Sequence, residues 1–255
     1  MPFDDRSPGT PPLTTLDRAF LVLDAFGPAD DGLSLAELTR RTQVPKPTVL
    51  RIARALVGWG ALERSAAGYR LGHRLIELGG QARGQQRLRD LALPFMSDLY
   101  GLTHGAVHLA VLDGTRTLIL EKIAGPDSVP VASMPGRCGP AHCTGLGKVL
   151  LAFSPGDTVD QVIAAGLTRR TPHTIARPSA LRAQLAEVRR TGIGFEREES
   201  TEGVACLAAP VFTKQRALAG AISVACPVGA PQLHRTGPAV RNLAAALSRV
   251  VATRL

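Results

Sequence analysis

The sequence lacks any apolar run that approaches the roughly 18 residues needed to cross a bilayer. The two longest candidates, residues 204–212 and 218–228, are each interrupted by proline or glycine. Lipidation motifs and a separate basic amphipathic helix are also missing. Residues 1–12 are rich in proline, glycine and charge and contain no apolar segment of the kind found in a secretory signal. We therefore expect a disordered tail over residues 1–12, no membrane partner and a cytoplasmic location.

Cysteine is scarce, with four residues among 255, all in the second half of the chain. In the absence of a secretion signal, we expect Cys138, Cys143, Cys206 and Cys226 to be reduced thiols rather than a disulfide framework. Cys138, His142 and Cys143 lie close enough in sequence to suggest a metal site. Their spacing argues against one, because structural zinc usually requires paired C-x-x-C ligands or two further histidines. The sequence therefore predicts neither a metal nor another cofactor.

The common signatures of catalysis are absent as well. The chain has no nucleophile elbow, no pair of catalytic carboxylates and no zinc-hydrolase helix motif. A glycine-lysine pair lies within residues 142–149, but His142 and Val149 stand where a phosphate loop requires glycine and serine or threonine. An enzyme with Cys206 or Cys143 as nucleophile and His142 as base stays open as an alternative. Cys206 lies in a strongly apolar segment that disfavours a thiolate, so we expect no catalytic residues.

Acidic residues are few relative to basic ones, 21 against 30, which gives a net charge of +9. The excess is concentrated between residues 34 and 90, where eleven Lys and Arg face four Asp and Glu. The rest of the chain is close to neutral. A basic region of this kind is typical of proteins that bind nucleic acid. At this length and apolar content the chain can form two domains of unequal size, of which the basic one lies first.

The basic region contains two helices in close succession. Ser34 and Glu37 form the sequence pattern of a capping box, so a helix begins there and carries Arg40 and Arg41 on its outer side. Residues 42–44 make a turn before Pro45-Lys46-Pro47, where proline is tolerated at the first helical position. A second helix begins at that point, and the order helix, turn, helix is the arrangement that places a helix in the major groove of DNA.

In the second helix, Val49, Ile52, Ala53 and Leu56 have the spacing of a buried stripe. The opposite face presents Pro47, Thr48, Arg51, Arg54 and Ala55. Arginine can bind a guanine through two hydrogen bonds, and threonine can hydrogen-bond a base or touch a thymine methyl group. The alternative is an ordinary solvated helix face. Because caps, turn, prolines and the following hairpin agree, we favour a recognition helix.

Residues 62–65 and 69–71 flank a turn that ends in Gly68, a pattern that predicts a β-hairpin and therefore a winged helix-turn-helix. We expect Trp59 in the core behind this wing. Upstream, Thr14 and Asp17 cap a further helix, so the DNA-binding domain is predicted over residues 13–74. The buried stripe of that first helix is expected to be Leu16, Ala19, Phe20, Leu23 and Phe26. The expected DNA contacts are Lys46, Thr48, Arg51, Arg54, Arg64, Tyr69 and Arg70, of which the wing arginines would lie near phosphates.

Residues 75–90 predict a linker helix that could pair with a second copy of the chain, and residues 91–255 a second domain. A helix with a possible break at Pro94 is expected over residues 88–102. Strands, helices and a final helix from Pro238 follow. This order predicts an α+β domain with helices on an antiparallel sheet. The predicted strands are residues 104–112, 117–123, 194–199, 204–212 and 218–225, and the predicted helices are residues 144–153 and 178–190.

Two segments of this domain carry a resemblance to a known family. The first is GRCGPAHCTGLGKVLLA at residues 136–152, and the second combines GIGFEREE at residues 192–199 with GVACLAAPV at residues 203–211. Together with the winged helix-turn-helix, they resemble the IclR family of bacterial transcriptional regulators over residues 13–255. The resemblance implies a GAF-like C-terminal domain that binds a small metabolite, often an organic acid, in a protein that forms dimers or dimers of dimers.

The resemblance also implies the residues of the effector pocket, namely Gly145, Leu146, Glu196, Cys206 and Ser223. Glu196 departs from the shorter aspartate of well-known members, and Ala225 stands where they can have a second serine. The glycine-rich start of the helix at residues 144–153 offers backbone N–H groups suited to a carboxylate, although a tight turn alone would also require these glycines.

The sequence therefore predicts a regulator, with a repressor favoured, whose affinity for a pseudo-palindromic double-stranded operator depends on an effector. An architectural DNA binder without effector is the other alternative.

Overall fold

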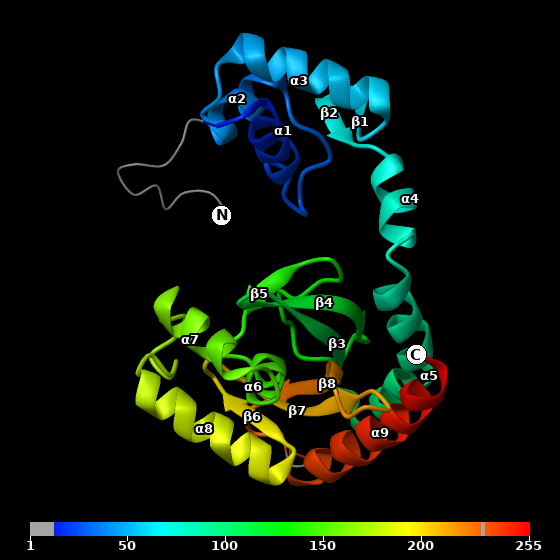
Figure 1. Cartoon of the computed structure of the whole chain (residues 1–255), viewed down its shortest axis with the longest axis vertical. Helices are drawn as coiled ribbons and strands as arrows, with labels where there is room; N and C mark the ends of the chain where they lie inside the picture. The colour runs from blue at the N-terminus through cyan, green and yellow to red at the C-terminus, as the bar shows by residue number, and fades with distance from the viewer. Residues whose placement is uncertain (1–12, 231–232) are drawn as a thin grey trace. The chain divides into compact units, whose positions relative to one another are not determined.

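The computed structural model describes residues 13–230 and 233–255 and divides the chain into two compact units, with the boundary between Arg83 and Gly84 (Figure 1). The tail predicted over residues 1–12 lies outside the described residues. Within the described ranges, no helix is both long and apolar enough to cross a membrane.

The first unit is a winged helix-turn-helix. Its helices α1 to α3 are followed by a two-stranded antiparallel sheet of β1 and β2 and by the helix α4. Thr14 and Asp17 form a reciprocal capping box at the start of α1. Ser34 caps α2 by accepting the N–H of Glu37 at 3.1 Å. The elements span Thr15–Asp24 (α1), Leu35–Thr42 (α2), Lys46–Trp59 (α3), Leu62–Ser65 (β1), Gly68–Leu71 (β2) and Arg74–Gly80 (α4).

The core of this unit is built from one face of each element. The predicted stripe of α3 packs inward, with Val49, Ile52 and Ala53 buried. In α1 the prediction was partly wrong, because Leu16 and Phe20 are 62% and 46% exposed. The interior side chain of α1 is instead the fully buried Val22. The helix is therefore rotated relative to the stripe that its spacing predicted.

The expectations for Trp59 and for a continuous linker helix were also wrong. Trp59 is the last residue of α3 and is 53% exposed, with the Arg74 guanidinium 5.8 Å from its ring centre. The core position behind the hairpin is occupied by Tyr69 instead.

The linker is interrupted after Gly79-Gly80, since glycine is a poor helix former. The next helix, α5 (Arg83–Thr103), begins beyond the break and continues through Pro94.

The second unit is an α+β domain around a six-stranded antiparallel sheet with the order β5-β4-β3-β8-β7-β6. Every predicted strand is present with small shifts at its ends. The strand β5, only three residues long, and the helix α7 were not predicted. The strands span Ala106–Asp113 (β3), Arg116–Ile123 (β4), Cys138–Pro140 (β5), Gly194–Arg197 (β6), Val204–Phe212 (β7) and Leu218–Pro227 (β8).

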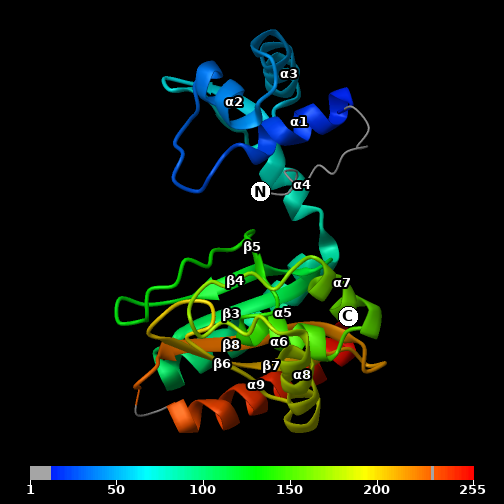
Figure 2. The same ribbon diagram turned by 90° about the vertical axis from the view of Figure 1, so that its left-hand side faces the viewer.

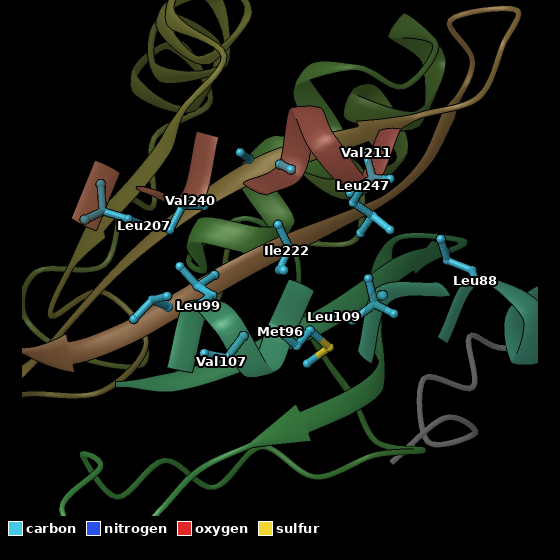
Figure 3. Close-up of a cluster of buried hydrophobic side chains, with 14 of the residues drawn as sticks. Leu88, Met96, Leu99, Val107, Leu109, Leu207, Val211, Ile222, Val240 and Leu247 are labelled. Atoms are coloured by element: carbon cyan, nitrogen blue, oxygen red, sulfur yellow. The ribbon is translucent and has the colours of Figure 1, made fainter. Parts of the chain in front are cut away.

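Helices cover both faces of this sheet (Figure 2). On one face, α5 and α9 (Leu233–Arg254) close a core that includes Leu99, Leu109 and Ile222 (Figure 3). On the other face lie α6 (Gly145–Ala152), α7 (Gly156–Ala164) and α8 (Pro178–Thr191). Because side chains alternate along a strand, every second residue of β3, β7 and β8 faces this second layer. That face carries the polar side chains of the cavity described below.

Candidate DNA-binding surface and effector cavity

The outer face of α3 presents the side chains predicted to contact DNA. Arg51 and Arg54 are exposed, Thr48 is half-buried beside them, and Lys46 is exposed at the first residue of the helix. Within the described part of the chain, neither Arg51 nor Arg54 takes part in an ion pair. Two unpaired guanidiniums on one side of a helix can reach the edges of bases.

The arginines of α2 are in a different state. Arg41 contacts Asp30 at 2.6 Å and Glu37 at 2.8 Å, and Arg40 contacts Glu37 at 2.7 Å. Hydrogen bonds from Arg40 and then Arg41 lower the pKa of Glu37 to about 2. The carboxylates of the unit therefore offset the charge of α2, while the charge of α3 stays available to an external anion.

The wing differs from its prediction in one residue. Tyr69 is only 2% exposed, because its backbone pairs with Leu33 through hydrogen bonds of 2.7 and 2.9 Å that turn the ring inward. It has almost no surface to offer to DNA, so the structure does not support it as a contact. Arg64 is exposed, and its guanidinium lies 4.6 Å from the centre of the Tyr69 ring. Arg70 is exposed but contacts Glu63, its partner on β1, at 2.8 Å.

This ion pair predicts the effect of Glu63→Gln. Hydrogen bonds from His73 and then Arg70 lower the pKa of Glu63 to about 2, so its charge opposes DNA at any ordinary pH. Arg70 must leave Glu63 before it can contact a phosphate, so removing the charge of Glu63 makes that contact easier to form. We expect tighter binding to operator and scrambled duplex alike. Fluorescence anisotropy at one fixed salt concentration measures both affinities. Glu77→Gln, on α4, is the control of equal charge, and unchanged affinities in Glu63→Gln would contradict the prediction.

The second unit contains a cavity of about 320 Å³ on the sheet face that carries α6. Its floor is formed by two rows of side chains across neighbouring strands. One row contains Glu196, Cys206 and Ala225, and the other contains Ser223 and His108. Four of the five residues expected in an effector pocket therefore line one cavity: Leu146, Glu196, Cys206 and Ser223.

Gly145 does not line the cavity but packs against Cys206, which does. A Cβ atom at this position would lie 3.1 Å from both the carbonyl oxygen and the Sγ atom of Cys206. At Gly147 a Cβ would lie 2.1 Å from the carbonyl oxygen of Ala141, so only glycine fits there. The Gly147 N–H is already bound by the Thr144 hydroxyl at 3.0 Å. Backbone packing thus explains these glycines, and part of the helix N-terminus is capped by the chain itself.

One end of the cavity is acidic and buried. Glu196 is 2% exposed, and its Oε2 atom accepts the N–H of Glu199 at 2.9 Å. The Glu199 carboxylate forms an ion pair with Lys148, whose side chain is fully buried. Burial raises the pKa of Glu196 to about 7, and the charge of Glu199 adds to the rise, while backbone N–H groups and Lys148 oppose it.

Another part of the cavity is lined by the segment between β4 and β5. His108 Nε2 lies 2.7 Å from the Ser133 hydroxyl, and Lys122 donates to the carbonyl oxygens of Val131 at 2.9 Å and Ser133 at 3.0 Å. Burial, followed by the charge of Lys122, lowers the pKa of His108 to about 4. His108 is therefore neutral at physiological pH, and its ring carries one N–H donor and one acceptor nitrogen.

The thiols give no support to the enzyme alternative. Burial raises the pKa of Cys206 and of Cys143 to about 12, so both stay protonated near neutral pH. Burial also lowers the pKa of His142, whose Nε2 atom is 3.1 Å from the Thr168 carbonyl oxygen. Across residues 13–230 and 233–255, no group of three or more metal-binding side chains comes together.

Several polar residues of the cavity were missed in the sequence: His108, Thr117, Ser133, Arg137, Arg170, Ser200 and Thr201. His108 carried a usable signal, because a histidine between apolar neighbours on a predicted strand marks a polar position on one face. Thr117 lies at the start of the predicted strand β4, and the others come from loops, which no periodicity marks.

Comparison with known proteins supplies a family for both units. Residues 81–250 match the family described as "Bacterial transcriptional regulator IclR C-terminal", and residues 15–66 match "IclR helix-turn-helix domain". The transcriptional regulator XynR of Escherichia coli is 30% identical over 218 residues, which cover 84% of this chain and 86% of the relative. The glycerol operon regulatory protein of Streptomyces griseus is 32% identical over 245 residues, covering 93% and 96%.

A similar solved structure is that of an IclR homolog from Microbacterium hydrocarbonoxydans complexed with 4-hydroxybenzoate. Its TM-score is 0.86 at 27% identity, and the match covers 94% of this chain and 100% of that chain.

Proposed function

Because the chain belongs to the IclR family of bacterial transcriptional regulators, with a helix-turn-helix domain and an effector-binding domain, we propose that α3 reads an operator under the control of an organic acid. The operator is a pseudo-palindrome bound by a dimer or a dimer of dimers. The protein acts as a repressor in the cytoplasm and catalyses no reaction. Among the α3 residues, Thr48, Arg51 and Arg54 contact bases, while Lys46 and the wing arginines Arg64 and Arg70 contact phosphates.

One observation carries the proposal. Arg51 and Arg54 are exposed and unpaired on the side of α3 opposite its buried stripe, whereas the arginines of α2 are held by carboxylates of the same unit. Support for the effector comes from the cavity, where Leu146, Glu196, Cys206 and Ser223 meet. The ligand of the Microbacterium relative, 4-hydroxybenzoate, is an organic acid of a size that suits such a cavity.

The proposal is tested by binding of the full chain to the duplex upstream of its own gene. We expect tighter binding to this duplex than to a scrambled one, and a change in that affinity when an active carboxylate is added. If the carboxylate alters DNA affinity by some factor, DNA must alter carboxylate affinity by the same factor. No preference for the upstream duplex, with or without a panel of carboxylates, would contradict the proposed function.

A further inference from the structure

The floor of the cavity around Cys206 offers side chains that can donate hydrogen bonds to a ligand. The Ser223 hydroxyl is fully buried and, apart from a weak hydrogen bond with the Cys206 thiol, has no partner among the described residues. Burial dominates at Cys206 and keeps its thiol protonated, although hydrogen bonds with Ser223 and with the Gly145 N–H lower its pKa. Leu146, in the first turn of α6, lines the same place, where the helix dipole favours negative charge. These groups favour an acceptor, such as a carboxylate.

The exception is Glu196, which lies on the strand next to Cys206 and is its register partner. If Glu196 were ionised, two carboxylates would meet in a buried site, which is costly without a cation between them. If it were protonated, it would be a further donor to the ligand.

Among the described residues, no buried cation is left to neutralise Glu196. Lys148 on α6 is engaged by Glu199, so two buried carboxyl groups share one buried ammonium. On the neighbouring strand β7, Cys206 is a neutral thiol. The segment before α6 contributes Cys143, which is also a protonated thiol, and His142, whose pKa is lowered by burial. The buried side chains of α8 are apolar, and the two cavity arginines, Arg137 and Arg170, are exposed.

We propose that the effector carboxylate enters this cavity together with one proton from solvent, which Glu196 carries in the complex. This inference rests on the proposed function, because it concerns the regulation of the same site. The balance is simple: the ligand stays an anion, the ionised Glu196 gains a proton, and the new O–H donates to the ligand carboxylate. The ligand then binds most tightly at a pH where Glu196 is already protonated, and its affinity falls as the pH rises. The charge of the ligand raises the proton affinity of Glu196 further.

The first test uses the ligand-free protein. Carbon-13 spectra of glutamate-labelled wild type and Glu196→Gln identify the Glu196 carboxyl by difference, with the exposed Glu202→Gln as matched control. We expect this carboxyl to titrate near pH 7, where burial sets its pKa. Titration below pH 5 would overturn the proposal whatever the ligand is.

The second test uses sodium 4-hydroxybenzoate and a panel of other small carboxylates, with calorimetry in phosphate and Tris buffers. For a carboxylate that binds, we expect uptake of about one proton at pH 8 and roughly tenfold weaker binding per pH unit above that. Glu196→Gln, whose amide is a permanent donor, should bind with no such dependence, and Glu202→Gln should behave as wild type. An equal pH slope in Glu196→Gln, or no carboxylate bound at pH 6, would overturn the inference.

The two proposals fail in different ways. A carboxylate that controls operator binding without proton uptake leaves the proposed function standing and overturns the inference alone. If the chain shows no operator preference, the proposed function fails, although proton-linked binding of a carboxylate would still be measurable.

Discussion

Lys148→Met is expected to destabilise the second unit by about 3 to 5 kcal/mol at neutral pH, the usual result of breaking a buried ion pair from one side. Lys148 is fully buried on α6, and its ammonium group contacts Glu199, whose side chain is 7% exposed. Methionine fills a similar volume but leaves the Glu199 carboxylate without its cation. Chemical denaturation followed by circular dichroism measures the loss. Loss of a cation from a solvated pair, as in Arg190→Met on α8, should change stability very little.

The double variant Lys148→Met/Glu199→Gln separates the charge from the packing. Because the one carboxyl group that it leaves beside the lost ammonium, Glu196, has a pKa raised by burial to about 7 and can take up a proton, we expect it to recover most of the stability lost in Lys148→Met. Additive losses in the double variant would show that Lys148 acts through packing alone.

The local order of elements could be predicted from the sequence because it depends on nearby residues. Each helix start is marked by residues only a few positions apart: Thr14 with Asp17, Ser34 with Glu37, and the prolines around Lys46. The strands of the second unit follow from apolar runs and turn residues in the same way.

Orientation about an element's axis was less predictable. The wing gave no local sign that Tyr69 turns inward, because its direction is set by backbone pairing with Leu33, 36 residues earlier in the chain. Tyr69 is in the core of this unit, where Trp59 had been expected, and Trp59 is exposed. An aromatic ring next to a wing arginine is equally compatible with core and surface, and only the long-range pairing decides between them.

Only some residues of the effector cavity could be predicted from the sequence. Leu146, Glu196, Cys206 and Ser223 were named through the family resemblance, and the structure brings all four to one cavity. Their joint position depends on register between β6, β7 and β8, which spacing alone does not determine. The raised pKa of Glu196 could not be predicted either, because both its burial and the ion pair between Lys148 and Glu199 depend on packing.

Arg51→Ala is expected to reduce discrimination between operator and scrambled duplex by roughly 5- to 150-fold, the range for one bidentate base contact. Arg51 is exposed at the centre of the outer face of α3, without an ion pair among the described residues that would hold it away from DNA. Arg70→Ala is the matched control, since a wing arginine near a phosphate affects both duplexes similarly. Both variants are compared with wild type by anisotropy at one fixed salt concentration, because affinity for DNA changes steeply with salt.

The ratio of the two affinities, rather than either affinity alone, decides which residue reads sequence. If Arg51→Ala weakens both duplexes equally, Arg51 contacts a phosphate and the base-reading residues lie elsewhere on α3, with Arg54 the next to substitute. If instead Arg70→Ala lowers the ratio, the wing enters a groove and reads bases. In the free protein Arg70 is 2.8 Å from Glu63, so that second outcome requires this ion pair to open when DNA binds. Glu63→Gln should then raise the ratio of operator affinity to scrambled-duplex affinity, rather than both affinities alike.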